Sequence, residues 1–329
     1  MRLLTSALCA TVASGLLCGC AGTFPAGTYG DAAPARAVQV RHEPVPTATP
    51  EPRGGIYVSQ FDGTDILGYG SGNKALKGPI CTIRSGMYVN DVAVDGRGNL
   101  IDPDGASKYV TVFKGPRMCG EKLGSFRDQY GQPSDASSLD AETGKIAVAN
   151  IRDHGSLPGS LSICTLRSGC TSNLTNPKMY AAEAVAMARN DCWVDAKRTA
   201  AGGAGLIYFA GCAGQGEAAT GFRNSTTGGI DIDNQGNLVI IDQTKSVVYI
   251  YRGCNPACTV VGGPFALKAE CFFGKLNSAN TLYATVDQLG GAIDFYSYST
   301  KAIKFEHAVK GLPISLAPEG IAQNPRSRQ

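Results

Sequence analysis

The segment Gly228–Asp242 reads GGIDIDNQGNLVIID, and the segment SVVYIY follows it at residues 246–251. Asn, Gln and Gly at 234–236 form a turn signal between an alternating run and a fully apolar run. A further short run, TVVG, occupies residues 259–262. This part of the chain therefore predicts four consecutive antiparallel strands that are joined by short turns.

The same pattern recurs along most of the chain. It is seen in NDVAVDGRGNLI from Asn90, in DASSLDAETGKIAVA from Asp135 and in EAVAMARNDCWV from Glu183, and more loosely from Glu270 and Glu319. The six units start at residues 90, 135, 183, 228, 270 and 319, which lie 42 to 49 residues apart. A four-stranded unit that repeats every ~40–50 residues is typical of the blades of a β-propeller.

The two ends of the repeat region complement each other. GIYVSQF at residues 55–61 matches the second strand of a unit, whereas APEGIAQN at residues 317–324 matches a first strand with no second strand after it. We therefore predict an all-β fold, a six-bladed β-propeller over residues 55–324 whose first blade is closed by the C-terminal strand, with a tail at 325–329. The unit resembles that of the NHL-repeat propellers, which read Pro-x-Gly-Ile-Ala-Val-Asp-x-x-Gly-Asn-Ile-Tyr-Val.

The composition narrows the classes of function. Of the 329 residues 17% are charged and 43% are hydrophobic, and the formal net charge is +3, so the chain is not a disordered polyelectrolyte. It has no dense Lys/Arg block, which argues against a nucleic acid as partner. Only three His are present, and the Gly-x-Ser-x-Gly, His-Glu-x-x-His and phosphate-loop motifs do not occur. The sequence therefore contains none of these catalytic motifs from which a reaction could be assigned.

The N-terminus predicts a location. Residues 1–19 combine one Arg with an apolar stretch that is typical of an export signal and is too short for a stable membrane span. The sequence LCGCA around Cys20 resembles the lipobox of bacterial lipoproteins, in which this cysteine becomes the acylated N-terminus. That resemblance implies a palmitate-modified protein anchored to the bilayer of the cell envelope, and Ala21 is compatible with the outer membrane. Ordinary secretion is the alternative. Residues 20–54 are rich in Ala, Pro, Thr and Gly and predict a flexible tether.

Nine cysteines remain when the three in the first twenty residues are set aside. In an exported chain they are candidates for disulfides, and an odd number leaves at least one without a partner in the same chain. Cys164 and Cys170 flank one short turn, and Cys254 and Cys258 flank another, so each pair is a possible disulfide. The chain has no Cys-x-x-Cys pair, which favours a structural role over zinc or redox chemistry.

The first strand of each unit is expected to begin at one mouth of the central channel. The residues at these six positions are Glu319, Asn90, Asp135, Glu183, Gly228 and Glu270. Four carboxylates that face one another repel unless a cation or protons lie between them, and oxygen ligands of this kind suit Ca²⁺ or Mg²⁺. The arrangement resembles the gluconolactonase and senescence-marker-protein family, in which a Glu, two Asn and an Asp hold a divalent ion that hydrolyses sugar lactones.

This resemblance implies a set of site residues. Pro-Glu-Gly around Glu319 is similar to the family's Glu-Gly-Pro, and Asn90-Asp91 is similar to its Asn-Asp-Gly, whereas Gly228 offers no ligand. The implied metal ligands are Glu319, Asn90, Asp135, Glu183 and Glu270, and the implied catalytic residues are Glu319 and Asp135. The metal would polarise the lactone carbonyl while a carboxylate activates water. The opposing interpretation is a solvated mouth that binds ions loosely or not at all.

Three functions remain open from the sequence. The first is a membrane-tethered propeller outside the cytoplasm that binds a protein or a small molecule through its mouth and loops, with no assigned reaction. The second is a lactonase-like hydrolase that requires calcium or another divalent cation. The third is a scaffold of the cell envelope that docks other proteins on a flat face. A propeller supports all three, because its function depends on the sites that its loops carry.

Overall fold

The computed structural model describes residues 40–41 and 55–324, except 62, 71–77, 87–88, 105–106, 116–118, 132–135, 143 and 153–157. The predicted signal, the predicted lipidation site Cys20 and nearly all of the predicted tether lie outside these ranges. No helix among the described residues has the length and apolar character to cross a membrane.

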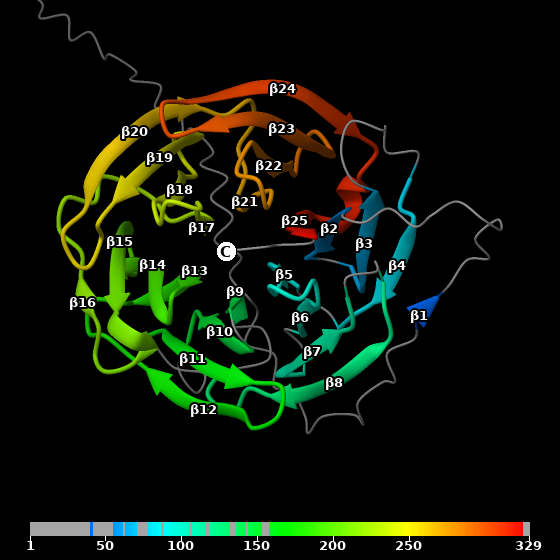
Figure 1. Ribbon diagram of the computed structural model, residues 1–329, viewed down its shortest axis with the longest axis horizontal. Helices are drawn as coiled ribbons and strands as arrows, with labels where there is room; N and C mark the ends of the chain where they lie inside the picture. The colour runs from blue at the N-terminus through cyan, green and yellow to red at the C-terminus, as the bar shows by residue number, and fades with distance from the viewer. Residues whose placement is uncertain are drawn as a thin grey trace, which may run out of the picture. The chain divides into compact units, whose positions relative to one another are not determined.

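Six antiparallel sheets surround a central axis as the blades of a propeller (Figure 1), which confirms the predicted fold class. The first blade, from the centre outward, contains β25 (Pro318–Asn324), β2 (Gly55–Gln60), β3 (Asp65–Gly70), β4 (Cys81–Arg84) and β1 (Val40–Arg41). The second contains β5 (Ala93–Val94), β6 (Leu100–Asp104), β7 (Tyr109–Phe113) and β8 (Lys122–Arg127). The third contains β9 (Ala136–Glu142), β10 (Lys145–Asn150), β11 (Ser160–Thr165) and β12 (Gly169–Leu174).

The other three blades have the same order. The fourth contains β13 (Ala181–Ala188), β14 (Asp191–Thr199), β15 (Gly202–Phe209) and β16 (Glu217–Ala218). The fifth contains β17 (Ile230–Ile232), β18 (Leu238–Asp242), β19 (Val247–Arg252) and β20 (Thr259–Ala266). The sixth contains β21 (Gly274–Leu276), β22 (Leu282–Asp287), β23 (Ala292–Ser299) and β24 (Ala302–Lys310). Two short 3₁₀ turns, η1 (Ala210–Cys212) and η2 (Ile314–Leu316), lie in connections.

The C-terminal strand closes the ring. β25 pairs antiparallel with β2, with Val58 opposite Ile321 and Gly55 opposite Asn324. The innermost strand of the first blade thus comes from the C-terminus and the other strands from the N-terminal half, as predicted. One pairing lies outside the predicted propeller range, because Val40 in β1 pairs with Ile83 in β4. Two residues of the predicted tether therefore add a fifth strand to this blade.

The recurring Asp-x-x-Gly-Asn motif builds the turn after the innermost strand. In the fifth blade Oδ1 of Asp233 accepts the N–H groups of Gln235 and Asn237, at 2.9 and 2.8 Å, and the Asn237 amide donates to Oδ2 at 2.8 Å. Gly236 has a φ of 80°, which glycine adopts without steric cost. Asp95 and its partners make the same contacts in the second blade. The motif is therefore explained by turn geometry.

Buried carboxylates connect neighbouring innermost strands. Oδ2 of Asp231 in β17 accepts the N–H of Leu276 in β21 at 2.7 Å, and Oδ2 of Asp140 in β9 accepts the N–H of Met187 in β13 at 2.8 Å. Both carboxylates belong to side chains with no exposed surface or almost none. These contacts fix the spacing of the strands that line the channel.

The apolar core lies between the blades. The second strands are its centre, since every residue of LVIID in β18 is buried and IAVAN in β10 is buried throughout. Full burial of one such aliphatic side chain stabilises the fold by about 1.5–3 kcal/mol. Trp193 packs against this core, and its indole N–H donates to the main-chain oxygen of Cys254 in the next blade at 2.9 Å.

The two faces of the ring differ in their connections. We call the face at which the innermost strands begin the mouth face. It also carries the turns between the second and third strands and the connections from blade to blade. The opposite face carries the remaining turns, between first and second and between third and fourth strands.

Four disulfides lie on the opposite face. They join Cys81 to Cys119, Cys164 to Cys170, Cys192 to Cys212 and Cys254 to Cys258. The structure thus forms both pairs suggested by the short spacings. It adds a link between the first two blades and a link from β14 to η1. Cys271 is a buried free thiol, and burial raises its pKa to about 12.

Candidate functional site

The predicted mouth residues occupy different environments, and two of them come together. Gly320, next to Glu319, donates its N–H to Oγ of Ser59 at 2.9 Å, and this hydroxyl reaches the main-chain oxygen of Asn90 at 3.4 Å. A Cβ atom on Gly320 would lie 2.4 Å from the Cα of Asp91. The Glu319–Gly320 and Asn90–Asp91 segments are therefore in direct contact.

Glu183 has a counter-ion from its own blade. Its side chain is only 8% exposed, and its Oε1 lies 2.8 Å from Nζ of Lys197, which is 44% exposed. Asp195 is fully buried close by, and its Oδ2 accepts the N–H of Gly228 at 3.2 Å. Burial raises the pKa of Asp195 well above its ordinary value, and the charge of Glu183 adds to this effect. Gly228, the mouth position of the fifth blade, thus takes part through its main chain.

The structure describes one of the two remaining predicted residues. Glu270 is exposed in the connection to β21 and accepts a hydrogen bond from the Gln243 amide at 3.3 Å. Asp135 lies outside the described residues. Within the described ranges, no three His, Cys, Asp or Glu side chains are grouped closely enough to hold a metal ion.

A buried lysine lies at the centre of the mouth. Lys275, in the middle of β21, is 4% exposed, and its ammonium donates to the main-chain oxygen of Ile230 at 3.4 Å. The same Nζ atom is 3.9 Å from Oδ2 of Asp91, whose side chain is fully buried. The main-chain oxygen of Lys275 accepts the Gln323 amide at 2.7 Å. This residue of the sixth blade therefore contacts the fifth, second and first blades.

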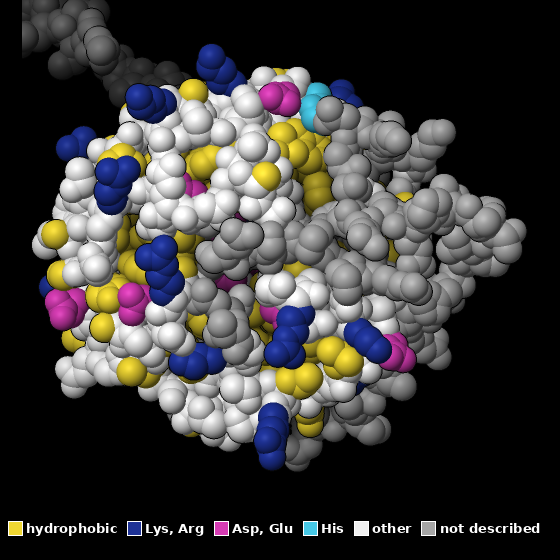
Figure 2. Space-filling model, in the orientation of Figure 1, with side chains coloured by type: hydrophobic (Ala, Val, Ile, Leu, Met, Phe, Trp, Pro, Cys, Tyr) yellow, Lys and Arg dark blue, Asp and Glu magenta, His cyan; other side chains and the backbone are white. Residues whose placement is uncertain are grey.

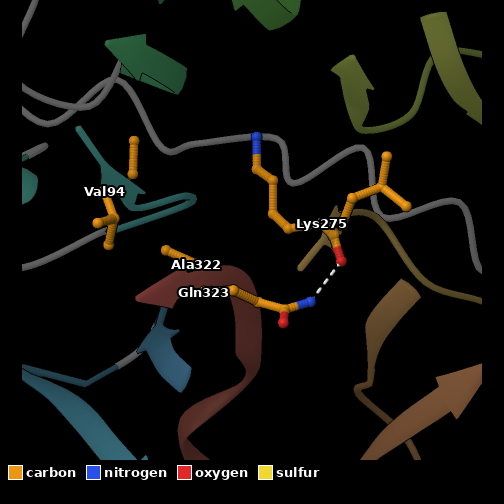
Figure 3. Close-up of a pocket in the computed structure, with 6 residues that line it drawn as sticks. Val94, Lys275, Ala322 and Gln323 are labelled. Atoms are coloured by element: carbon orange, nitrogen blue, oxygen red, sulfur yellow. Dashed lines mark hydrogen bonds between the residues drawn. The ribbon is translucent and has the colours of Figure 1, made fainter. Parts of the chain in front are cut away.

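The space beside Lys275 is small. It is lined by Ala93, Val94, Lys275, Leu276, Ala322 and Gln323 from three innermost strands (Figure 3). Its volume of about 10 Å³ is room for about one water molecule. A sugar-sized ligand cannot enter this cavity unless the innermost strands separate.

Two other buried acids of the mouth face also form ion pairs with lysines, as Glu183 does. Asp242 lies 3.0 Å from Nζ of Lys245, and Asp294 lies 3.1 Å from Nζ of Lys268. Both carboxylates are buried and both lysines are roughly half exposed. Burial alone would raise the pKa of Asp242, but hydrogen bonds from Ser225, Lys245 and Thr226 hold it below its ordinary value. Lysines of the chain thus lie against four buried acids of this face, Glu183, Asp91, Asp242 and Asp294.

The positive side chains do not gather into one patch. Figure 2 shows Lys and Arg standing apart from one another on the face in view, with apolar and uncharged surface between them. This distribution agrees with the absence of a Lys/Arg block in the sequence.

The sequence analysis missed three members of the site, Lys275, Asp91 and Asp195. Lys275 interrupts the apolar run FFGKL, and a lysine inside a predicted innermost strand is a signal because buried lysines are rare unless paired. Asp91 stood in the quoted motif beside Asn90 but was not assigned a role. Nothing in the local sequence shows that Asp195 meets the backbone of the next blade.

The comparisons with known proteins show the fold. No protein-family model matches the chain, and no curated protein matches it. Among solved structures it is similar to the periplasmic gluconolactonase PpgL of Pseudomonas aeruginosa, with a TM-score of 0.55 and 11% identity over 82% of this chain and 99% of that one. It is also similar to a chain of a nidogen/laminin complex, with a TM-score of 0.59 and 10% identity over 83% and 99%. A functionally unknown protein of Desulfotomaculum acetoxidans matches with a TM-score of 0.54 and 13% identity over 82% and 98%.

Proposed function

We propose that this protein is an exported, lipid-anchored β-propeller that binds a protein or a small molecule through its mouth and loops, with no specific reaction assigned. The observation that carries the proposal is the pairing of the mouth's buried acids with lysines of the chain. Lys197 neutralises Glu183, and Lys275 lies against Asp91. A mouth that already holds ammonium groups has less need of a divalent cation.

The small volume beside Lys275 supports the same conclusion. An enzyme that acts at the channel needs a cleft that encloses its substrate, and pockets for small molecules usually measure ~300–1,000 Å³. The cavity beside Lys275 has room for about one water molecule and is not such a cleft. The exposed loops around the mouth are then the surface available for a partner.

The disulfides support export. Such bonds form and persist in oxidising compartments and are rare in the cytosol. Eight cysteines form four disulfides, all on one face, and Cys271 is buried among the core residues. An export signal and lipid modification of Cys20 provide the route and the anchor.

Anchoring is tested by labelling cells that express the full chain with radioactive palmitate and separating membranes from soluble fractions. We expect label in the membrane-bound protein and none in the Cys20→Ser variant. Cys18→Ser is the matched control and should keep the label. Equal labelling of wild type and Cys20→Ser would contradict the anchor.

A lactonase-like hydrolase is the second candidate, because Glu319–Gly320 and Asn90–Asp91 are in contact. In this alternative, the cation site would use Glu319, Asn90, Asp135 and Glu183, and a carboxylate would activate water. It predicts calcium-dependent hydrolysis of sugar lactones that Glu319→Gln abolishes. The binding proposal predicts no lactone turnover above the Glu319→Gln background at any calcium concentration. The third candidate is a scaffold of the cell envelope. In that case the protein also acts by binding, and its partner is another envelope protein.

A further inference from the structure

Two large apolar side chains are exposed on neighbouring segments of the mouth face. Leu289, at the tip of the β22–β23 turn, is 84% exposed, and Ile314, the first residue of η2, is 60% exposed. The N–H of Leu312 donates to the main-chain oxygen of Gly291 at 3.0 Å, which holds the two segments together. A Cβ atom on Gly291 would lie 2.6 Å from Cγ2 of Ile314. We call Leu289 and Ile314 the mouth-face apolar pair.

The fold does not explain why these positions are apolar. The turn is held by Asp287, whose Oδ1 accepts the N–H of Gly290 at 2.6 Å, and by the positive φ of 58° at Gly291. Neither contact needs the Leu289 side chain. Leu312, two residues before Ile314, supplies the buried contact of this connection. The apolar pair therefore adds exposed apolar surface that contributes little to the core.

The charges around the pair are basic. Lys310, at the end of β24, is exposed and pairs in register with Ala292, the neighbour of Gly291. It forms no ion pair within the described part of the chain. Lys268 is 41% exposed, whereas its partner Asp294 is 1% exposed. The exposed Lys310 thus lies beside the β22–β23 turn, whereas Asp287 and Asp294 near this turn are buried.

We infer that the mouth-face apolar pair inserts into the headgroup region of an anionic bilayer, with Lys310 against the lipid phosphates. Exposed Leu and Ile beside Lys are the combination that binds peripheral proteins to anionic membranes. The inference deepens the proposed function, since a tether at Cys20 would keep the propeller within reach of the bilayer. The sixth blade and the connection to β25 are then the edge of the ring that touches the membrane.

The test uses the chain from Ala21 to Gln329, which lacks the predicted signal and acylated cysteine and contains every described strand. Binding is measured by co-sedimentation with vesicles of phosphatidylcholine alone or mixed with phosphatidylglycerol. We expect binding to the mixed vesicles that is weakened by salt and falls about tenfold or more in Leu289→Ser/Ile314→Ser. Leu166→Ser, an exposed leucine in a turn of the opposite face, is the matched control and should bind like wild type.

Each outcome decides the inference. Both substituted residues are exposed, so the melting temperature should stay within about 2 °C of wild type, which separates lost binding from lost folding. Wild-type binding to neither vesicle overturns the inference and leaves a protein as the occupant of the pair. Equal binding by the double variant also overturns it. Because this chain lacks Cys20, these results do not depend on palmitate labelling, which tests the anchor separately.

Discussion

The ammonium of Lys275 lies 3.9 Å from Oδ2 of Asp91, and these two residues belong to blades that are two places apart around the ring. The lysine therefore connects blades that are not neighbours, across the mouth of the channel. Its contact with the Ile230 main chain adds the fifth blade. The contacts of one buried side chain thus join the second, fifth and sixth blades.

Removal of the Lys275 charge should destabilise the protein. Lys275→Met leaves Asp91 buried without this ammonium, and the loss of one partner of a buried ion pair costs about 3–5 kcal/mol. Lys304→Met, an exposed lysine on β24, should change the free energy of unfolding by less than about 0.5 kcal/mol. Urea unfolding followed by circular dichroism measures both. If Lys275→Met unfolds like wild type, the lysine does not hold the mouth together.

Asp102 should make the stability of the folded protein decrease as the pH rises. It is 1% exposed in β6, and burial raises its pKa to about 7, although the Ser85 side chain and Lys122 oppose the shift. A carboxyl whose pKa is higher in the folded state favours folding at low pH, and this stability is lost as the pH rises toward 7. Asp102→Asn removes this dependence, so the variant should gain stability over wild type as the pH rises.

The comparison is made by thermal unfolding of wild type and Asp102→Asn at about pH 4 and about pH 8. We expect similar stability at the lower pH and an advantage of the variant at the higher pH, with an upper limit of about 4 kcal/mol. An advantage of equal size at both pH values would show that the substitution acts through packing.

Gly320 should tolerate no side chain. A Cβ atom there would lie 2.4 Å from the Cα of Asp91 and 2.5 Å from the main-chain oxygen of Asn90, and backbone atoms cannot move away freely. Gly320→Ala should therefore cost about 1–3 kcal/mol. Gly96→Ala, where no atom lies within 4 Å of the added Cβ, is the control and should be nearly neutral. Equal melting temperatures for the two variants would contradict the close approach of β25 to the second blade.

The disulfides should differ in their contribution. The chain-entropy model gives less stabilisation for the Cys254–Cys258 ring, with a separation of 4 residues, than for Cys192–Cys212, with a separation of 20. We expect losses of about 2 and about 3 kcal/mol for the paired Cys→Ala variants. Trp193 is the single tryptophan and donates to the Cys254 main chain, so its fluorescence should shift in the Cys254/Cys258 variant at native conditions. An unchanged spectrum would mean that this turn keeps its position without the disulfide.

The sequence was sufficient for the ring because local signals and the fold agree there. Asp233 and Asn237 determine the turn after an innermost strand by hydrogen bonds within five residues, so the motif could be recognised wherever it recurs. The strand at residues 317–324 lacked a successor, and only closure with residues 55–61 could satisfy its edge. The turn motif and the unmatched strands at the two ends can both be read directly from the order of residues along the chain.

The site was harder to predict because its contacts join distant residues. Glu183 could be placed at the start of β13 from the repeat, but the repeat does not show that Lys197 neutralises it. The lysines of the mouth face lie at positions that are not equivalent from blade to blade. The repeat therefore gave the positions of acids such as Glu183 but not the lysines beside them.

The most direct test is a measurement of bound metal and of calcium-dependent melting on the chain from Ala21 to Gln329. The variants are Glu319→Gln, which removes the expected ligand next to Gly320, and Gln215→Ala, an exposed residue between β15 and β16 on the opposite face, which should not affect a mouth site. Because lysines of the chain neutralise the mouth, we predict no stoichiometric divalent ion and no calcium-dependent change in melting temperature in any of the three proteins. One bound divalent ion per chain, with a calcium-dependent rise in melting temperature that only Glu319→Gln loses, would contradict the account.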